Sequence, residues 1–322
     1  MSHELTIRKN QKVEMAYVGD VPWHGLGQRL EEGADIETWK TAAGMDWRVC
    51  RSRVRYGDGA NQQIYDGAHV LFRSDDKSPL GIVSPKYKVV QPGEVLEFFR
   101  DLTDGNGYKL HTAGTMFGGK RFWALAAIGE EATVVGEDRV GGFLLLSSSA
   151  DGSLATSARF TTVRVVCNNT LSMALGDGKS NEVVVRHASA FDPEGVKNRL
   201  GLARGQFKEF MDAARVLAAK RITASDAGQF VGELLVDTKT VLGQVKDVSE
   251  SRQYQRIMDL FKTDALGGTL LSAEGTKWGL VNAVTQFVDH DARAATADSR
   301  MASAWFGRGD ALKTAAFAKA LA

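Results

Sequence analysis

The residue pattern changes near residue 190, and this change constrains the fold more than any other feature of the chain. Before it, short runs of alternating apolar and polar residues are separated by glycine-rich turns, as is typical of antiparallel strands. After it, from Asp192-Pro193-Glu194 onward, apolar residues recur at helical spacing, and Pro193 suits the first position of a helix. We therefore predict an α+β fold, with an α+β domain that holds an antiparallel meander sheet and packed helices over 1–190, and a mostly helical region over 191–322.

Turn and cap signals divide the first region into a series of helices and strands. We expect a helix, three strands, a second helix and two hairpins, in that order, over 35–43, 46–56, 68–73, 80–90, 92–102, 108–128 and 140–166. Gly44 is placed to end the first helix, and Pro92 to begin the second. Gly118-Gly119 and Ala150-Asp151-Gly152 mark the two hairpin turns.

The stretch after the hairpins is expected to contain a short helix and a strand. Asn168 or Asn169 can cap a helix that runs through Leu175, and a strand follows over 182–187. Six helices are then expected, over 193–220, 224–238, 249–264, 273–291, 294–305 and 309–321.

Composition excludes several classes of protein. The 40 Lys and Arg residues balance 39 Asp and Glu residues to a net charge of +1, which excludes a chain that is basic overall but permits a local basic patch. No apolar run approaches the ~18 residues of a membrane span, and Met1 to Asn10 lacks the apolar segment of a secretory signal, so a cytoplasmic protein is expected. Two cysteines, Cys50 and Cys167, cannot build a disulfide framework or a four-thiolate zinc site.

Three arginines that alternate in one predicted strand give the clearest functional signal. Arg51, Arg53 and Arg55 share a face because successive side chains of a strand point to opposite sides, and no acidic residue lies between Trp47 and Tyr56. Guanidinium groups at this spacing can follow a phosphate backbone, and Trp47 or Tyr56 can stack on a base. The alternative is an edge strand whose charges prevent it from pairing with other chains.

Further basic residues lie in the two predicted hairpins. Lys120, Arg121 and Arg164 are secondary candidates for phosphate contacts. Arg159 and Arg164 fall on opposite faces of their strand and cannot both serve one site, so at least one of them is expected to pair with an acid elsewhere.

Catalytic motifs are absent from the sequence. Cys167 precedes a predicted helix, a position that can activate a thiol, but no histidine stands in a cysteine-hydrolase signature, so a buried structural cysteine is favoured. Asp289-His290 lacks a further metal ligand at helical spacing, and no glycine-rich phosphate loop occurs. We expect no catalytic residue, no metal and no small-molecule cofactor. The alternative is an enzyme that uses Trp23-His24, Cys167 or Asp289-His290, brought together by folding.

Several blocks of sequence resemble a known family. They run from Val21 to Gly27, from Arg164 to Leu171 and from Gly275 to Thr285, with Asp289-His290 and Ala304-Trp305-Phe306-Gly307 beyond the last. In this order they resemble the phage/plasmid-like protein family that contains domain of unknown function 932, over nearly the whole chain. The resemblance implies that the chain is carried by a phage, a plasmid or another mobile genetic element, and it implies no catalytic residues.

A second resemblance lies in the order of the predicted elements. A helix over 93–102, three or four antiparallel strands over 108–166 and a helix over 168–175 are similar to the core of Rad52-like single-strand annealing proteins. The resemblance implies a homo-oligomeric ring or filament that binds single-stranded DNA in a basic groove. The chain departs from that pattern because Asn168 to Leu175 carries no charge.

These observations favour a non-enzymatic DNA-binding protein of a mobile element, with the role of a homo-oligomeric single-strand annealing or recombination factor in the bacterial cytoplasm. The alternative is an assembly factor whose helical C-terminal region binds a partner protein. Trp278, Trp305 and Phe306 would anchor such a partner, since aromatic residues dominate interfaces. The same three side chains also suit the core of a helical layer.

Overall fold

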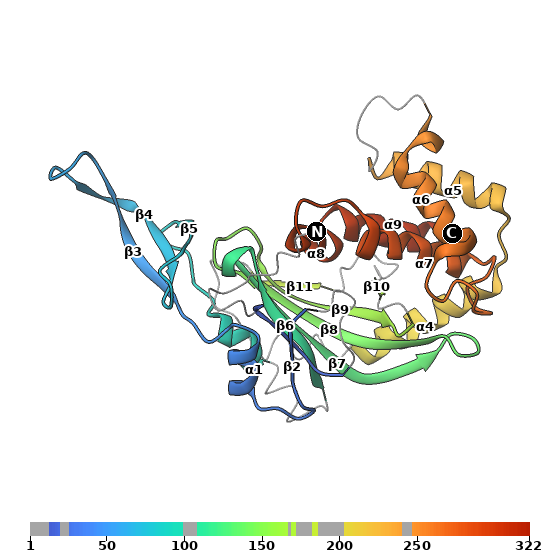
Figure 1. Ribbon diagram of the computed structural model, residues 1–322, viewed down its shortest axis with the longest axis horizontal. Helices are drawn as coiled ribbons and strands as arrows, with labels where there is room; N and C mark the ends of the chain where they lie inside the picture. The colour runs from blue at the N-terminus through green and yellow to red at the C-terminus, as the bar shows by residue number, and fades with distance from the viewer. Residues whose placement is uncertain are drawn as a thin grey trace.

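The computed structural model describes residues 13–19, 26–98, 108–166, 169–171, 182–185, 203–239 and 247–322. It contains a central sheet, a layer of helices from the C-terminal region, and a small separate sheet that projects as an arm (Figure 1). The predicted α+β class is confirmed, with the strands concentrated in the first part of the chain and the helices in the second.

The central sheet has the strand order β10-β9-β8-β7-β6-β1-β2, and β11 also pairs with β9. Its strands are β1 Met15–Tyr17, β2 Gln28–Arg29, β6 Lys109–Met116, β7 Arg121–Thr133, β8 Arg139–Ser149, β9 Thr156–Arg164, β10 Asn169–Leu171 and β11 Glu182–Val185. Both predicted hairpins are confirmed as β6–β7 and β8–β9. The first turns through η1 Phe117–Gly119, where Gly118 and Gly119 have φ angles of 71° and 88° that favour glycine.

Two predicted elements differ from the part of the chain that the structure describes. The strand predicted over 80–90 ends at Val83, and the helix predicted from Asn168 or Asn169 is not formed at Asn169. The sequence predicts that Asn169 begins or caps a helix, but Asn169–Leu171 is strand β10, which pairs with Thr162 to Arg164 of β9. The backbone N–H and the hydroxyl of Thr170 also donate to the Asp289 carboxylate, 119 residues later in the chain. These long-range bonds outweigh the local preference of asparagine for a cap. Residues 172–175 of the expected helix lie outside the described residues.

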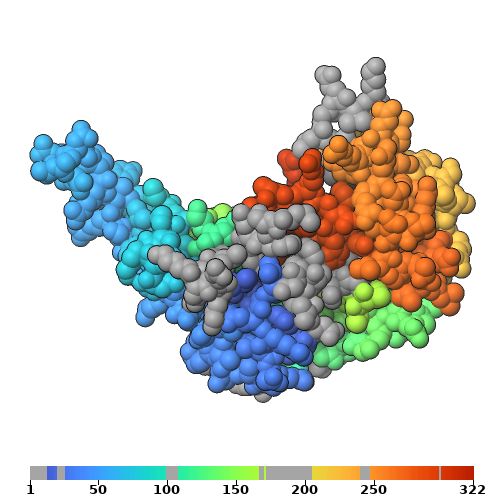
Figure 2. Space-filling view, in the orientation of Figure 1, coloured from blue at the N-terminus to red at the C-terminus, as the bar shows by residue number. Residues whose placement is uncertain are grey.

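The arm is a second sheet of three strands, β3 Val49–Tyr56, β4 Gln63–Arg73 and β5 Pro79–Val83, in that order. Its distal end stands clear of the rest of the molecule (Figure 2). At its base lies α1 Ile36–Ala42, which Asp35 caps by accepting a hydrogen bond from the Thr38 amide at 2.7 Å. Residues 92–98 are helical, which confirms the start of the helix predicted at Pro92.

The C-terminal region supplies the helical layer. Its helices are α4 Ala203–Ala219, α5 Ala224–Asp237, α6 Arg252–Asp259, α7 Lys277–Gln286, α8 Ala297–Phe306 and α9 Arg308–Leu321, joined by the short helical turns η2 Val248–Glu250, η3 Leu260–Asp264 and η4 Phe287–Asp291. Side chains of Thr223, Ser251, Thr276 and Thr296 cap four of them. α4 lies against β7, β8 and β9, and α9 lies against α7 and α8. In the described part of the chain, no helix is long and apolar enough to cross a bilayer.

Both faces of the central sheet are buried at its centre. Ala124 and Leu144 point into the main core, which also contains residues of α4, α7 and α9. Trp123 and Leu145 point the other way, into a second cluster with α8. Successive residues of β7 and β8 point to opposite faces, and apolar side chains occupy both. The centre of the sheet is therefore a structural support for the elements around it. Exposed basic groups lie on the arm, at strand ends and on the helical layer.

Candidate nucleic-acid interface

The three arginines of β3 are exposed along the arm. Arg51, Arg53 and Arg55 alternate with Ser52 and Val54, so their side chains leave the same face of the strand. Their cross-strand neighbours on β4 are Leu71, His69 and Ile64, respectively. No acidic residue therefore stands directly opposite any of them, and no ion pair of Arg53 or Arg55 is found among the residues that the structure describes.

Positive charge gathers on the arm together with the residues that flank it. Residues 48–88, which add Arg48, Lys86 and Lys88 to the arm, contain eight Lys and Arg residues, four Asp residues and no Glu, a net charge of +4, whereas 49–83 alone carries +1. The whole chain carries only +1, so the remainder is acidic. A nearly neutral protein with such a local excess attracts polyanions to one surface.

Exposed apolar side chains occupy the opposite face of the arm. Tyr56 is 55% exposed, Tyr65 is 52% exposed and Ile82 is 67% exposed. Tyr65 lies across from Val54, which places it on the face away from the arginines. The Tyr56 hydroxyl donates to Gln63 at 2.8 Å, and its ring stays open to solvent. Sequence reasoning identified Tyr56 but missed Tyr65, because a bulge in β4 shifts the register between the two strands.

Trp47 does not belong to this surface, which corrects the expectation that it stacks on a base. Its ring is 4% exposed, and its Nε1 donates to the Gly44 carbonyl at 2.8 Å. The Arg73 guanidinium lies 4.2 Å from the ring centroid. The two-residue period places Trp47 on the arginine face, but this end of β3 is covered by the body of the protein.

A buried ion pair fixes the base of the arm. Arg73 of β4 donates to Glu14 at 2.6 Å, and both side chains are buried. It also donates to Asp75 at 2.8 Å. Burial disfavours the charged guanidinium, but the hydrogen bonds to Asp75 and Glu14 outweigh it and raise the pKa of Arg73, while the same contact lowers the pKa of Asp75. Removing either partner of the buried pair would leave an uncompensated charge.

A second link joins the arm to the end of β8. The Arg51 guanidinium donates to the carbonyl of Tyr87, and the Tyr87 hydroxyl donates to the carbonyl of Ser149 at 2.9 Å. Burial raises the pKa of Tyr87 to about 12. Of the three arginines, Arg51 thus also has a structural contact, whereas Arg53 and Arg55 extend toward the tip.

The turn between β6 and β7 places Lys120 beside the base of the arm. Arg73 donates to the carbonyl of Gly118 in this turn at 3.3 Å. Lys120 is exposed, so it can extend the basic surface toward the body. Arg121 is half-buried, with its Nε donating to Ser153 at 3.0 Å and its guanidinium 5.3 Å from the Phe117 ring centroid.

Arg164 is a structural residue, which corrects its assignment as a phosphate contact. It is buried and donates to both oxygens of Asp138, at 2.7 and 2.9 Å. Arg159 pairs with Asp310 at 2.7 Å. The expectation that at least one of these two arginines pairs with an acid is confirmed for both.

Trp278 shares the same buried carboxylate, and the expectation that it anchors a partner is wrong. Its ring is buried, and its Nε1 donates to Asp138 at 2.9 Å. Trp305 and Phe306 are half-buried against the second face of the sheet, where Trp305 meets Trp123 edge-on with centroids 4.8 Å apart. These contacts favour the core interpretation of the aromatic residues in the helical layer.

Of the residues proposed for an alternative catalytic site, Asp289 and His290 lie in the described part of the chain. His24 and Cys167 lie outside the described residues. Asp289 is buried and pairs with Lys313 at 2.7 Å. Because Asp289 also accepts hydrogen bonds from Thr170, it ties η4 and α9 to strand β10. Its position therefore has a structural explanation.

Sequence reasoning missed a second basic region, a cavity in the helical layer lined by five arginines. They are Arg252, Arg256, Arg293, Arg300 and Arg308. They come from three helices and a connecting segment, so no short sequence motif predicts that they lie together. Only the packing of these segments brings the arginines to one place.

Comparison with known proteins identifies a family but no characterised relative. The model of the family Domain of unknown function (DUF932) matches residues 79–305, which is more than two thirds of the chain. No curated protein and no solved structure matches the chain. The match extends from β5 into α8, so it includes most of the central sheet and of the helical layer. The chain belongs to the DUF932 family.

Proposed function

We propose that the protein is a non-enzymatic DNA-binding protein of a phage or plasmid, and that its arm holds single-stranded DNA. The observation that carries this proposal is the row of Arg51, Arg53 and Arg55 on a projecting strand with no acidic residue opposite. Side chains two residues apart on a strand are separated by about 6.6 Å. One strand of a duplex rises about 3.4 Å per nucleotide, and an unstacked single strand extends beyond this, so a row at this spacing can follow the phosphates of a single strand.

The exposed tyrosines of the arm support a single strand as the ligand. Tyr56 and Tyr65 present open ring faces. In a duplex the faces of the bases are stacked on one another, whereas a single strand can lay its bases on aromatic side chains. Arginines on one face and tyrosines on the other allow the strand to wrap around the edge of the arm.

Within the mobile element, the protein would act as a homo-oligomeric annealing or recombination factor in the cytoplasm of the bacterial host. The helical residues 92–98 followed by the β6–β9 meander support this role, because they match the first part of the element order of Rad52-like proteins. Strand β10 departs from that order. The alternative of an assembly factor is less favoured, because the buried Trp278 cannot anchor a partner.

The first test is fluorescence anisotropy with a labelled oligo(dT) strand at low salt. We expect R51E/R53E/R55E to weaken binding at least tenfold, since three attractive charges become repulsive. R53E/R55E retains the contact of Arg51 with Tyr87 and should show most of the loss. The control R29E/K208E/K262E changes the charge by the same amount at exposed positions outside the arm and should bind like the wild type. Unchanged binding by both arm variants would exclude the arm.

Annealing is tested separately. The wild type should accelerate the pairing of complementary strands, and light scattering should report an oligomer. A protein that binds DNA but does not accelerate strand pairing would support the proposed interface and contradict the annealing role.

A further inference from the structure

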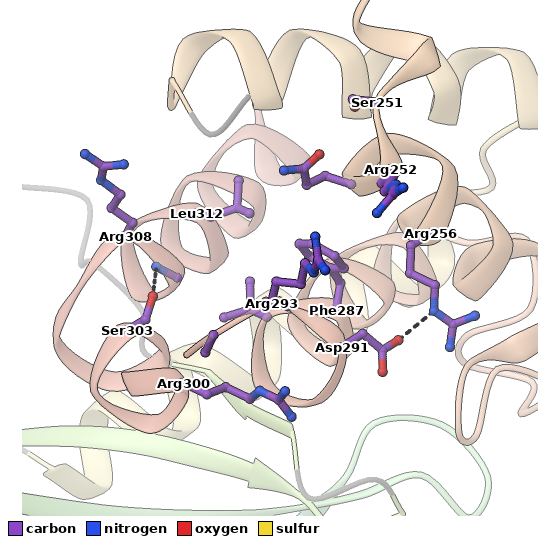
Figure 3. A pocket seen from close by; sticks show the side chains of 15 residues that line it. Ser251, Arg252, Arg256, Phe287, Asp291, Arg293, Arg300, Ser303, Arg308 and Leu312 are labelled. Atoms are coloured by element: carbon purple, nitrogen blue, oxygen red, sulfur yellow. Dashed lines mark hydrogen bonds and ion pairs between the residues drawn. The ribbon is translucent and has the colours of Figure 1, made fainter. Parts of the chain in front are cut away.

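The cavity in the helical layer lies between α6, η4, α8 and α9 (Figure 3). Its volume is about 540 Å³, within the range of pockets that bind small molecules. Among the described residues that line it, Asp291 is the single carboxylate beside the five arginines. The cavity therefore has a large excess of positive charge.

The one carboxylate is already occupied. Asp291 accepts a hydrogen bond from Nε of Arg256 at 2.7 Å, and Arg256 also pairs with Asp264 at 2.7 Å. The hydrogen bond to Asp291 is the main cause of the raised pKa of Arg256. This pair leaves the charge of the other arginines of the cavity without compensation by Asp291.

Three of those arginines are exposed at the edge of the cavity. Arg252, Arg293 and Arg308 have no ion pair with any residue that the structure describes. Arg300 is half-buried and donates to the carbonyl of His290 at 2.8 Å, which holds its guanidinium at one wall. Arginine side chains suit this arrangement, since the planar guanidinium donates two parallel hydrogen bonds to phosphate oxygens.

Two helices also begin at the cavity. α6 starts at Arg252 and α9 starts at Arg308, and both residues line it. The cap residue of α9, Gly307, provides no side-chain hydrogen bond to the helix. A helix N-terminus carries a partial positive charge, so both helices add to the field of the arginines.

The floor of the cavity is apolar. Phe287, Val288 and Leu312 line it and are largely buried. Figure 3 shows the labelled arginines arranged around Phe287 and Leu312. A site for a bare inorganic anion needs no such floor, whereas a ligand with a phosphate at one end and a planar apolar group at the other uses both parts.

We propose that this cavity binds a nucleoside phosphate. Arg252 and Arg293 contact the phosphate, and the base lies against Phe287 and Leu312. The same chemistry is offered by a free nucleotide and by the phosphorylated terminal nucleotide of a DNA strand. The site does not depend on DNA binding by the arm, since none of its residues belongs to β3, β4 or β5.

Isothermal titration calorimetry with adenosine diphosphate, adenosine and inorganic phosphate tests the site. If the ligand is a free nucleotide, adenosine diphosphate should bind at least tenfold more tightly than either adenosine or inorganic phosphate. R252E/R293E should weaken that binding at least tenfold, and R252K/R293K should weaken it less. The control R29E/K208E carries the same charge change outside the cavity and should bind like the wild type. Equal losses in the control and the cavity variant would overturn the proposal.

Binding of the phosphorylated end of a DNA strand is tested in the R51E/R53E/R55E variant, which lacks the arginine row of the arm. In that background, an oligonucleotide with a 5′-phosphate should bind at least tenfold tighter than the same oligonucleotide with a 5′-hydroxyl, and adding R252E/R293E should abolish the difference. Two results together would overturn the proposal: the wild type does not bind adenosine diphosphate, and it binds the 5′-phosphate and 5′-hydroxyl oligonucleotides equally. That result would leave the function of the arm standing.

Discussion

The arm and the cavity both gather arginines, but they hold them in opposite ways. The arm places Arg51, Arg53 and Arg55 in an open row along one strand. The cavity collects Arg252, Arg293 and Arg308 from separate segments around an apolar floor. An open row repeats one contact and suits a polymer, whereas arginines at the edge of one cavity suit a small ligand that carries a charged group.

The two regions also differ in their relation to the family. The segment matched by the family model begins at residue 79, after β3 and β4. It includes four of the five arginines of the cavity and excludes the arginine row. The proposed DNA contacts therefore rest on residues outside the matched segment, and the proposed nucleotide site rests mostly on residues inside it.

The largest expected effect concerns the frame that positions both regions. Asp138 is fully buried and accepts hydrogen bonds from Arg164, Ser272 and Trp278. Asp138→Asn leaves the Arg164 charge buried without its partner, which is expected to cost about 3–5 kcal/mol in the free energy of unfolding. Chemical denaturation measures the change. The exposed control Asp212→Asn should change it by less than about 0.5 kcal/mol, and a similar small effect at Asp138 would contradict this explanation.

A smaller effect should separate the two regions by ligand. Tyr65→Ala removes an exposed ring from the arm and should weaken binding of oligo(dT) by about 1–3 kcal/mol, since one stacked base is lost. Tyr65→Phe retains the ring and should bind like the wild type. Titration with adenosine diphosphate should show no change in either variant. Equal binding of oligo(dT) by Tyr65→Ala and the wild type would remove this ring from the interface.

The smallest expected effect concerns how the base of the arm responds to pH. Burial raises the pKa of Tyr87 from 10.0 to about 12, so the unfolded chain loses this proton at a lower pH than the folded protein does. The free energy of unfolding should therefore fall as pH rises from about 10 to about 12. In urea unfolding at pH 9 and pH 12, Tyr87→Phe should lose less stability than the wild type. An equal loss in both would show that Tyr87 does not contribute.

Local signals suffice for much of the fold. The Gly118-Gly119 turn predicts the β6–β7 hairpin, and Asp35 with Gly44 predicts helix α1. Each of these elements depends on residues close together in the chain. Asn169 misleads for the opposite reason, because the edge of β9 and the distant Asp289 decide the conformation of its segment.

The same distinction between local signals and long-range contacts applies to the candidate sites. The period of two residues in β3 is enough to place Arg51, Arg53 and Arg55 on one face. The period cannot show that Trp47 is covered, because its cover includes Arg73 of another strand.

No local sequence pattern predicts the cavity. Its arginines are spread along the chain from Arg252 to Arg308, with other elements between them. Only the packing of α6, η4, α8 and α9 brings them together, and that packing depends on contacts between residues far apart in the sequence.

The salt dependence of single-strand binding tests the central claim, that the arginine row of the arm holds DNA phosphates, most directly. On a single strand, each phosphate contact contributes about 0.7 to the slope of log affinity against log salt concentration. We predict that R51E/R53E/R55E has a slope about 2 smaller in magnitude than the wild type and the R29E/K208E/K262E control. An arm variant with the same slope as the wild type would contradict the claim.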